Sequence, residues 1–373
     1  MCDSIDFLSL ALPGVQALQP YQPGKPIEEL EREYGIREAI KLASNENPLG
    51  PSPKAITSIK NELDELARYP DGNGFALKEK LANKLNVSAN QITLGNGSND
   101  VLELLARAYV GVDDQVIFSQ HAFAVYPIVT QVVGGKAIIT PAKEWGHDLD
   151  AMQKAITDRT RLIFVANPNN PTGTWLSGDA LKEFIASVPE NILVVLDEAY
   201  YEYAIHPSMQ AEGYISALNW LSEFNNLVIT RTFSKAYGLA GLRIGFAVSN
   251  SQVADILNRV RQPFNVNSMA MSAAEIALTD DEFIEKSVQL NSTGMKELIS
   301  EFNDMGLQYI PSVGNFICVR VGNGTEVYEG LLREGVIVRP VANYEMLEYL
   351  RVTIGTEKEN RRFIAALKKV LNK

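Results

Sequence analysis

From about residue 90 onward, short β-favouring runs alternate with longer amphipathic segments, and this alternation constrains the fold more than any other feature. The short runs predict strands at residues 91–94, 115–118, 136–139, 161–165, 192–196, 226–230 and 244–248. Residues 99–110 predict a helix with one apolar face. Strands that alternate with helices form βαβ units, so we predict an α/β fold in which helices flank a mostly parallel sheet. The run 192–196 holds only Ile, Leu and Val, which predicts a central strand buried on both faces.

After about residue 280 the pattern changes to that of a smaller α+β unit. A long helical run at 281–302 precedes strand-like runs at 308–321, 336–341 and 350–354 and a terminal helix at 358–371. Near the N-terminus, Pro13, Pro20, Pro23 and Pro26 predict irregular chain until a helix at 27–34. We therefore expect an N-terminal arm that forms part of a small domain, a large domain and a C-terminal small domain, at residues 1–45, 46–280 and 281–373.

The charge and the cysteine content exclude several classes of protein. The chain carries 34 Lys plus Arg against 45 Asp plus Glu, a formal charge of −11, which disfavours binding to nucleic acid or to an anionic membrane. Cys2 and Cys318 are too few for a disulfide framework, and neither they nor the three histidines have the spacing of a metal site. No basic leader and no apolar run of about 18 residues is present. We expect a cytoplasmic protein without a bound metal.

Four polar motifs stand where predicted strands end. Gly95–Asn99 lies between a strand and a helix, Asn167–Gly173 follows one strand, and Asp197–Tyr200 ends the most apolar strand. The segment 232–246 places Lys235 among hydroxyls and glycines, with Arg243 eight residues later. Open α/β sheets build their ligand sites at the carboxyl ends of their strands. The motifs therefore predict one shared site, although a lone Ser-Lys would more simply be a surface loop.

Taken together and in this order, the motifs resemble those of the fold-type I pyridoxal-phosphate (PLP) aminotransferases, and within them the histidinol-phosphate aminotransferases. The resemblance extends from Pro13–Pro26 to the segment 350–356. It implies a large PLP-binding domain, a small α+β domain, and a homodimer with shared active sites. No metal is implied.

The resemblance assigns three residues to catalysis. Lys235 would form a Schiff base with the cofactor aldehyde and later move the substrate α-proton, tasks that suit an amine whose pKa falls readily on burial. Asp197 would pair with the pyridine nitrogen and keep it protonated, so that the ring accepts electrons. Tyr200, together with Asn170, would contact the phenolic oxygen of the cofactor. Helix capping by Asp197 and turn formation by Asn170 are the alternative roles.

The remaining cofactor contacts would form an anion cradle, because an acidic protein needs dedicated groups for a phosphate. Ser98 and Asn99 open the helix after the first strand and offer free N–H groups and the positive end of its dipole. Arg243 can supply a charge-assisted fork. The resemblance adds two hydroxyls, a ring-stacking aromatic and a tyrosine that reaches the partner's cofactor phosphate, namely Thr232, Ser234, Phe123 and Tyr69. Ser98 and Asn99 would serve equally well as helix caps, and Phe123 as a core residue.

Two arginines would separate the two substrates of a transamination. Arg351 matches the residue that grips an α-carboxylate, as in glutamate or 2-oxoglutarate, whereas Arg339 resembles a residue for the phosphate of histidinol phosphate. Tyr21 and Asn45 resemble pocket-wall residues. The resemblance implies conversion of L-histidinol phosphate and 2-oxoglutarate into imidazole-acetol phosphate and glutamate, in histidine biosynthesis. An aromatic amino-acid aminotransferase and, less favoured, a phospho-amino-acid decarboxylase remain alternatives, whereas a non-catalytic sensor fits poorly because the catalytic residues are all present.

Overall fold

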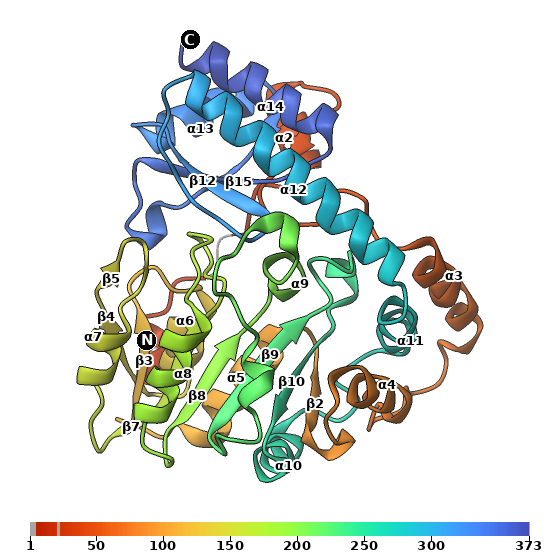
Figure 1. The fold of residues 1–373 in the computed structure, drawn as a ribbon, viewed down its shortest axis with the longest axis vertical. Helices are drawn as coiled ribbons and strands as arrows, with labels where there is room; N and C mark the ends of the chain where they lie inside the picture. The colour runs from red at the N-terminus through yellow and green to blue at the C-terminus, as the bar shows by residue number, and fades with distance from the viewer. Residues whose placement is uncertain (1–4, 21–22, 373) are drawn as a thin grey trace.

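The structure, a computed structural model, describes residues 5–20 and 23–372. Its centre is a seven-stranded sheet in the order β2-β10-β9-β8-β7-β3-β4 (Figure 1). The strands are β2 (Ile92–Gly95), β3 (Gln115–Ser119), β4 (Lys136–Thr140), β7 (Thr160–Ala166), β8 (Leu193–Asp197), β9 (Leu227–Thr232) and β10 (Gly245–Ser249). Every predicted strand is present, and β8 is the fourth of the seven and buried throughout. The prediction of a central, fully buried strand is therefore confirmed.

Strand direction gathers the ends of several strands at one edge of the sheet. β10 runs antiparallel to both its neighbours, and the other adjacent strands are parallel. The carboxyl ends of β2, β3, β7, β8 and β9 therefore lie at the same edge. Gly245, the first residue of β10, is paired with both Gly95 and Thr232, so the chain that enters β10 reaches this edge as well.

Two hydrophobic layers enclose the sheet because its strands alternate their side chains between the faces. Val194 and Leu196 point into one layer, and Leu193 and Val195 into the other. The first layer contains α3 (Pro53–Glu62), α4 (Phe75–Leu85), α7 (Leu149–Lys154), α8 (Gly178–Ser187) and α11 (Ser268–Ala277). The second contains α5 (Ser98–Tyr109), α6 (Val125–Val132) and α10 (Ser251–Val260). The α/β prediction with flanking helices is confirmed.

A smaller antiparallel sheet, in the order β11-β12-β15-β14, lies above the large one in Figure 1. Its strands are β11 (Tyr309–Ile310), β12 (Phe316–Arg320), β14 (Arg339–Pro340) and β15 (Tyr349–Thr353), packed with helices α12 (Asp281–Asp304), α13 (Gly324–Arg333) and α14 (Glu357–Val370) around a hydrophobic cluster of their own. The N-terminal region joins this part, because β1 (Ile40–Lys41) pairs in parallel with β13 (Val336–Ile337). Helix α2 (Ile27–Tyr34) buries Leu30 against Leu332 and Ile337.

The expectation of irregular chain before residue 27 is wrong at one place. Pro13–Gln16 forms a single helical turn, α1, with a proline in its first turn, where the missing N–H costs no hydrogen bond. The other short elements are β5 (Ala142–Lys143), β6 (Gly146–His147), α9 (Tyr201–Ala204) and 3₁₀ turns at Leu63–Glu65, Ala89–Gln91, Pro207–Met209, Ala217–Trp220, Ala240–Leu242 and Ala342–Tyr344. Within residues 5–20 and 23–372, no helix is long and apolar enough to span a membrane.

Candidate active site

A cavity of about 150 Å³ lies at the edge where the strands end. Among the described residues, ten of the predicted site residues line it: Ser98, Asn99, Phe123, Asn170, Asp197, Tyr200, Thr232, Ser234, Lys235 and Arg243. They come from the start of α5, from the loops after β3 and β7, and from the ends of β8 and β9 with the segments that follow them. The parallel strands therefore bring together side chains that are far apart in the sequence.

Asp197 ends β8 and is only 5% exposed. Its Oδ2 accepts a hydrogen bond from the Tyr126 hydroxyl at 3.0 Å, and its Oδ1 accepts one from Thr230 at 3.1 Å. Burial raises the pKa of Asp197 from 3.8 to about 6, and these two hydrogen bonds act in the opposite direction. The carboxyl is therefore mostly ionised at neutral pH and faces the cavity as a buried negative charge.

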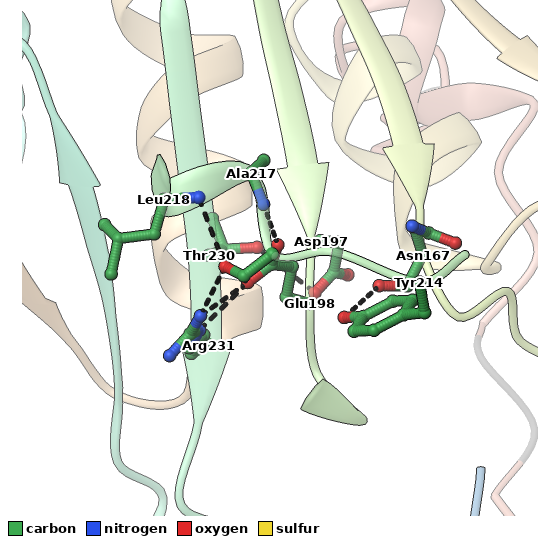
Figure 2. A network of polar contacts seen from close by, with 9 residues as sticks. Asn167, Asp197, Glu198, Tyr214, Ala217, Leu218, Thr230 and Arg231 are labelled. Carbon is green, nitrogen blue, oxygen red and sulfur yellow. Dashed lines mark hydrogen bonds and ion pairs between the residues drawn. The ribbon is translucent and has the colours of Figure 1, made fainter. Parts of the chain in front are cut away.

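The residue after Asp197 belongs to a second buried network, which Figure 2 shows. Glu198 accepts from the Arg231 Nη2 at 2.8 Å, from the Ala217 N–H at 2.8 Å and from the Ser216 hydroxyl at 3.0 Å. Arg231 also donates to Ser216 at 2.7 Å. Because Glu198 directly follows β8 and Arg231 lies on β9, the ion pair links the end of β8 to β9 directly beside Asp197.

Lys235 projects toward the same cavity from the segment after β9. Its Nζ donates to the backbone carbonyl of Ser44 at 3.2 Å. Burial, helped by the positive charges of Arg351 and Arg243, lowers the pKa of Lys235 from 10.5 to about 8 against the opposing charges of Glu46 and Asp197. A substantial fraction of the amine is therefore neutral near pH 8, as a nucleophile or a proton acceptor must be.

Tyr200 stands at the centre of a polar cluster on one wall. Its hydroxyl oxygen accepts from Asn45 Nδ2 at 2.8 Å and from Asn170 Nδ2 at 3.2 Å. Two accepted bonds occupy both lone pairs, which leaves the O–H hydrogen to donate into the cavity. Burial raises the pKa of Tyr200 to about 12, so the phenol keeps this hydrogen. Arg351 in turn donates to Asn170 Oδ1 and to the carbonyl of Ala43.

Another part of the cavity lining is suited to an anion. Helix α5 begins at Ser98, and Gly97 precedes it with φ +86°. Arg243 Nη1 donates to Ser234 Oγ at 3.3 Å, and a Cβ on Gly97 would stand only 2.4 Å from Arg243 Nη2. A Cβ on Gly245 would likewise meet the Ser98 nitrogen at 2.4 Å. The guanidinium and the helix N-terminus can approach each other this closely only because both positions are glycine.

The remaining predicted residues that the structure describes lie outside the cavity lining. Asn45 is 1% exposed and contacts Tyr200 rather than open space. Arg351 is 7% exposed, and its Nε has no hydrogen-bond partner. Tyr69 is 82% exposed and stacks on Phe264 with ring centroids 4.7 Å apart. Tyr21 lies outside the described residues.

Arg339 lines a separate and wider cleft of about 710 Å³. Its strand β14 pairs with β15, and Arg339 is the register partner of Arg351. The cleft is bordered by Gln19, Pro20, Pro23 and Gly24 of the N-terminal arm and by Ala122 and Ala124, on either side of Phe123. Phe123 lines the smaller cavity, so this segment lies between the two spaces.

Tyr126 and Thr230, whose hydroxyls contact Asp197, were not predicted from the sequence. Each is close in sequence to a predicted site residue, since Tyr126 stands three residues after Phe123 and Thr230 five residues before Lys235. Neither residue type distinguishes itself from a core tyrosine or a strand threonine, however. The same holds for Glu198 and Arg231, whose pairing depends on the neighbouring positions of β8 and β9.

The residues present fit PLP. The glycine-dependent cradle of Arg243 and the α5 N-terminus suits its phosphate, the buried carboxylate of Asp197 suits its ring nitrogen, and the O–H of Tyr200 suits its phenolic oxygen. Lys235 supplies an amine of lowered pKa in the same cavity. The fold and the site together define a fold-type I PLP-dependent aminotransferase.

Comparison with known proteins agrees with this class and narrows it. The model of the class I and II aminotransferases matches residues 37–367. Histidinol-phosphate aminotransferase 2 of Pseudomonas fluorescens (strain Pf0-1) is 60% identical over 369 residues, 98% of each chain. Histidinol-phosphate aminotransferase 1 of Nitrosococcus oceani is 57% identical over 372 residues, 100% of this chain and 99% of that one.

Among solved structures, the crystal structure of histidinol-phosphate aminotransferase from Sinorhizobium meliloti in complex with pyridoxal-5'-phosphate is similar with a TM-score of 0.88. It is 28% identical and covers 96% of this chain and 97% of that one. The chain belongs to the class I and II aminotransferase family and, within it, to the histidinol-phosphate aminotransferases. The predictions of the family, the fold class and the PLP cofactor are confirmed.

Proposed function

We propose that this chain transfers the amino group of L-histidinol phosphate to 2-oxoglutarate, giving imidazole-acetol phosphate and glutamate in histidine biosynthesis. The observation that carries the proposal is the convergence of Lys235, Asp197 and Tyr200 on one cavity that ends in an anion cradle. The relatives at 57–60% identity are named for this substrate. The low cysteine content supports a cytoplasmic location.

When bound, PLP supplies an electron sink that stabilises negative charge at the substrate carbon bearing the nitrogen. Asp197 would keep the ring nitrogen protonated through a buried carboxylate, and Tyr200 would donate its O–H to the phenolic oxygen. Arg243, Ser234, Thr232 and the N–H groups of Ser98 and Asn99 would hold the phosphate, with Phe123 against the ring. Lys235 Nζ would anchor the cofactor and, once displaced by the substrate amine, take and return the proton of the substrate carbon.

Two arginines would distinguish the amino donor from the amino acceptor. Arg351 donates to Asn170 and to the carbonyl of Ala43, and its Nε has no hydrogen-bond partner. This guanidinium would bind the carboxylate of the substrate. Histidinol phosphate has no such carboxylate, and we assign its phosphate to Arg339 in the wide cleft. We propose that the small domain comprises residues 281–373 with the arm 1–45, and that it carries both arginines over the large domain, 46–280.

The exposed Tyr69 supports a homodimer. It does not line the cavity of its own chain, and its ring stacks on Phe264, where both present aromatic surface to solvent. We propose that Tyr69 completes the phosphate cradle of the partner subunit. Each active site would then require two chains.

The deciding experiment is half-transamination of the purified PLP-loaded protein. The amino donors tested are histidinol phosphate, glutamate, phenylalanine, tyrosine and phosphothreonine. The reaction of each is followed by the absorbance of the bound cofactor. We expect rapid conversion by histidinol phosphate and glutamate, with Lys235→Ala as the inactive control. Faster conversion by phenylalanine or tyrosine would favour an aromatic amino-acid aminotransferase. Release of CO₂ from phosphothreonine would favour a phospho-amino-acid decarboxylase.

A further inference from the structure

Asp197 is held by two hydroxyl donors from two different elements of the large domain. Tyr126 belongs to α6 and reaches Oδ2, whereas Thr230 belongs to β9 and reaches Oδ1. Asp197 and Thr230 are register partners on adjacent strands, so the second contact follows directly from the sheet. Together the two donors give each carboxylate oxygen a hydrogen bond and restrict rotation of the carboxylate.

Tyr126 is itself held rigidly. The residue is fully buried, and its ring stacks on Phe164 with centroids 4.6 Å apart and planes 8° apart. The ring of Phe123, which lines the cavity, stands edge-on to it at 5.9 Å. Burial raises the pKa of Tyr126 well above 10, so its hydroxyl remains a neutral donor at every physiological pH. A fixed, neutral donor of this kind can orient the carboxylate through its hydrogen bond and adds no charge of its own.

We propose that Tyr126 and Thr230 are positioning residues that keep Asp197 ionised and oriented toward the cofactor nitrogen. The inference rests on the proposed function of Asp197. Burial disfavours the charged carboxylate, as does the negative charge of Glu198 next to it, and hydrogen bonds to the charged form oppose both effects. Lys235 also faces Asp197, and its positive form favours the carboxylate. The two hydroxyls, together with the backbone N–H of Ala199, offset part of the effect of burial.

Tyr126→Phe and Thr230→Val each remove one hydroxyl and keep the ring or branched shape that packs around it. Losing one donor raises the pKa of Asp197 by about one unit, because a hydrogen bond to a charged group is worth about that much. If only the ionised carboxylate pairs with the cofactor, PLP binding to the cofactor-free protein weakens about fivefold at pH 6 and very little at pH 8. A packing defect would weaken binding equally at both pH values.

The experiment measures the dissociation constant of PLP between pH 6 and pH 8 for each variant. Thr230→Ser keeps the hydroxyl and should restore the affinity of the unaltered protein. Tyr214→Phe is the matched control, since it removes a buried hydroxyl that bonds the Asn167 carbonyl instead of Asp197, and should leave the pH dependence unchanged. Figure 2 shows this hydroxyl beside the network. PLP titrates in the same range, so every curve is compared with the unaltered chain.

A double-mutant cycle separates the inference from the function on which it rests. In the Asp197→Asn background, Tyr126→Phe should have no further effect on the pH dependence. An equal effect in both backgrounds, or a defect of the same size at pH 6 and pH 8, would overturn the positioning role. If Asp197→Asn itself binds PLP and turns over normally, the proposed function of Asp197 fails instead.

Discussion

Gly97 gives the sharpest test of the anion cradle. It has φ +86° and ψ 163°, a region that only glycine adopts readily, and a Cβ there would stand 2.4 Å from Arg243 Nη2 and 3.1 Å from its Cζ. Gly97→Ala must therefore push the guanidinium away from Ser234, to which it donates at 3.3 Å. Cofactor binding and fold stability should both suffer, for two separable reasons.

The magnitudes follow from these two effects. Backbone strain in such a region costs about 1–3 kcal/mol, which lowers the free energy of unfolding. Losing a charge-assisted hydrogen bond to the phosphate costs about 1.5–3 kcal/mol, which weakens PLP binding roughly tenfold to a hundredfold. Gly322→Ala provides the control, because Gly322 has φ +83° and no atom within 4 Å of where a Cβ would lie. It should lose stability and keep its affinity for PLP.

The assay pairs equilibrium binding of PLP to the cofactor-free protein with denaturant unfolding of the same samples. Gly97→Ala should lose both stability and affinity, whereas Gly322→Ala should lose stability alone. If Gly97→Ala binds PLP as tightly as Gly322→Ala does, Arg243 either does not hold the phosphate or is not displaced. Either outcome would refute the cradle as described.

Three further predictions follow. In the cofactor-free protein, labelling of Lys235 by an amine-selective reagent should rise with pH around a midpoint near 8, since its pKa is lowered to about 8 and the neutral amine predominates above it; Arg351→Met should raise that midpoint, and an unchanged value would dismiss Arg351 as a cause. Arg339→Ala should raise the KM for histidinol phosphate about tenfold to a hundredfold and spare phenylalanine, whereas Arg351→Lys should impair glutamate and phenylalanine; equal losses would make Arg339 structural or shared. Tyr69→Phe should weaken PLP retention, and subunit exchange with Lys235→Ala should restore one intact site per mixed dimer. Mixed dimers that retain PLP no better than the Tyr69→Phe protein would exclude a role of Tyr69 across the interface.

Much of the fold was predictable because its signals are local. Burial on both faces requires an uninterrupted apolar run, so β8 could be recognised from residues 192–196, and its central position followed. Helix α5 was expected at 99–110 and begins at Ser98, where the polar residues after a strand mark its start. Lys235 and Asp197 were expected near strand ends because the polar motifs that contain them follow apolar runs in the sequence. Both residues line one cavity.

The sequence by itself therefore determined the order of the strands along the chain, their burial and the chemical groups at their ends, because periodicity and motif chemistry act within a few residues. Only the tertiary structure decided that Tyr126 and Thr230 contact Asp197, that Glu198 pairs with Arg231, and that Asn45 contacts Tyr200. These contacts join elements up to 155 residues apart. They depend on strand order, register and packing, and an isolated tyrosine, threonine or arginine carries no local signal of the partner that it will meet.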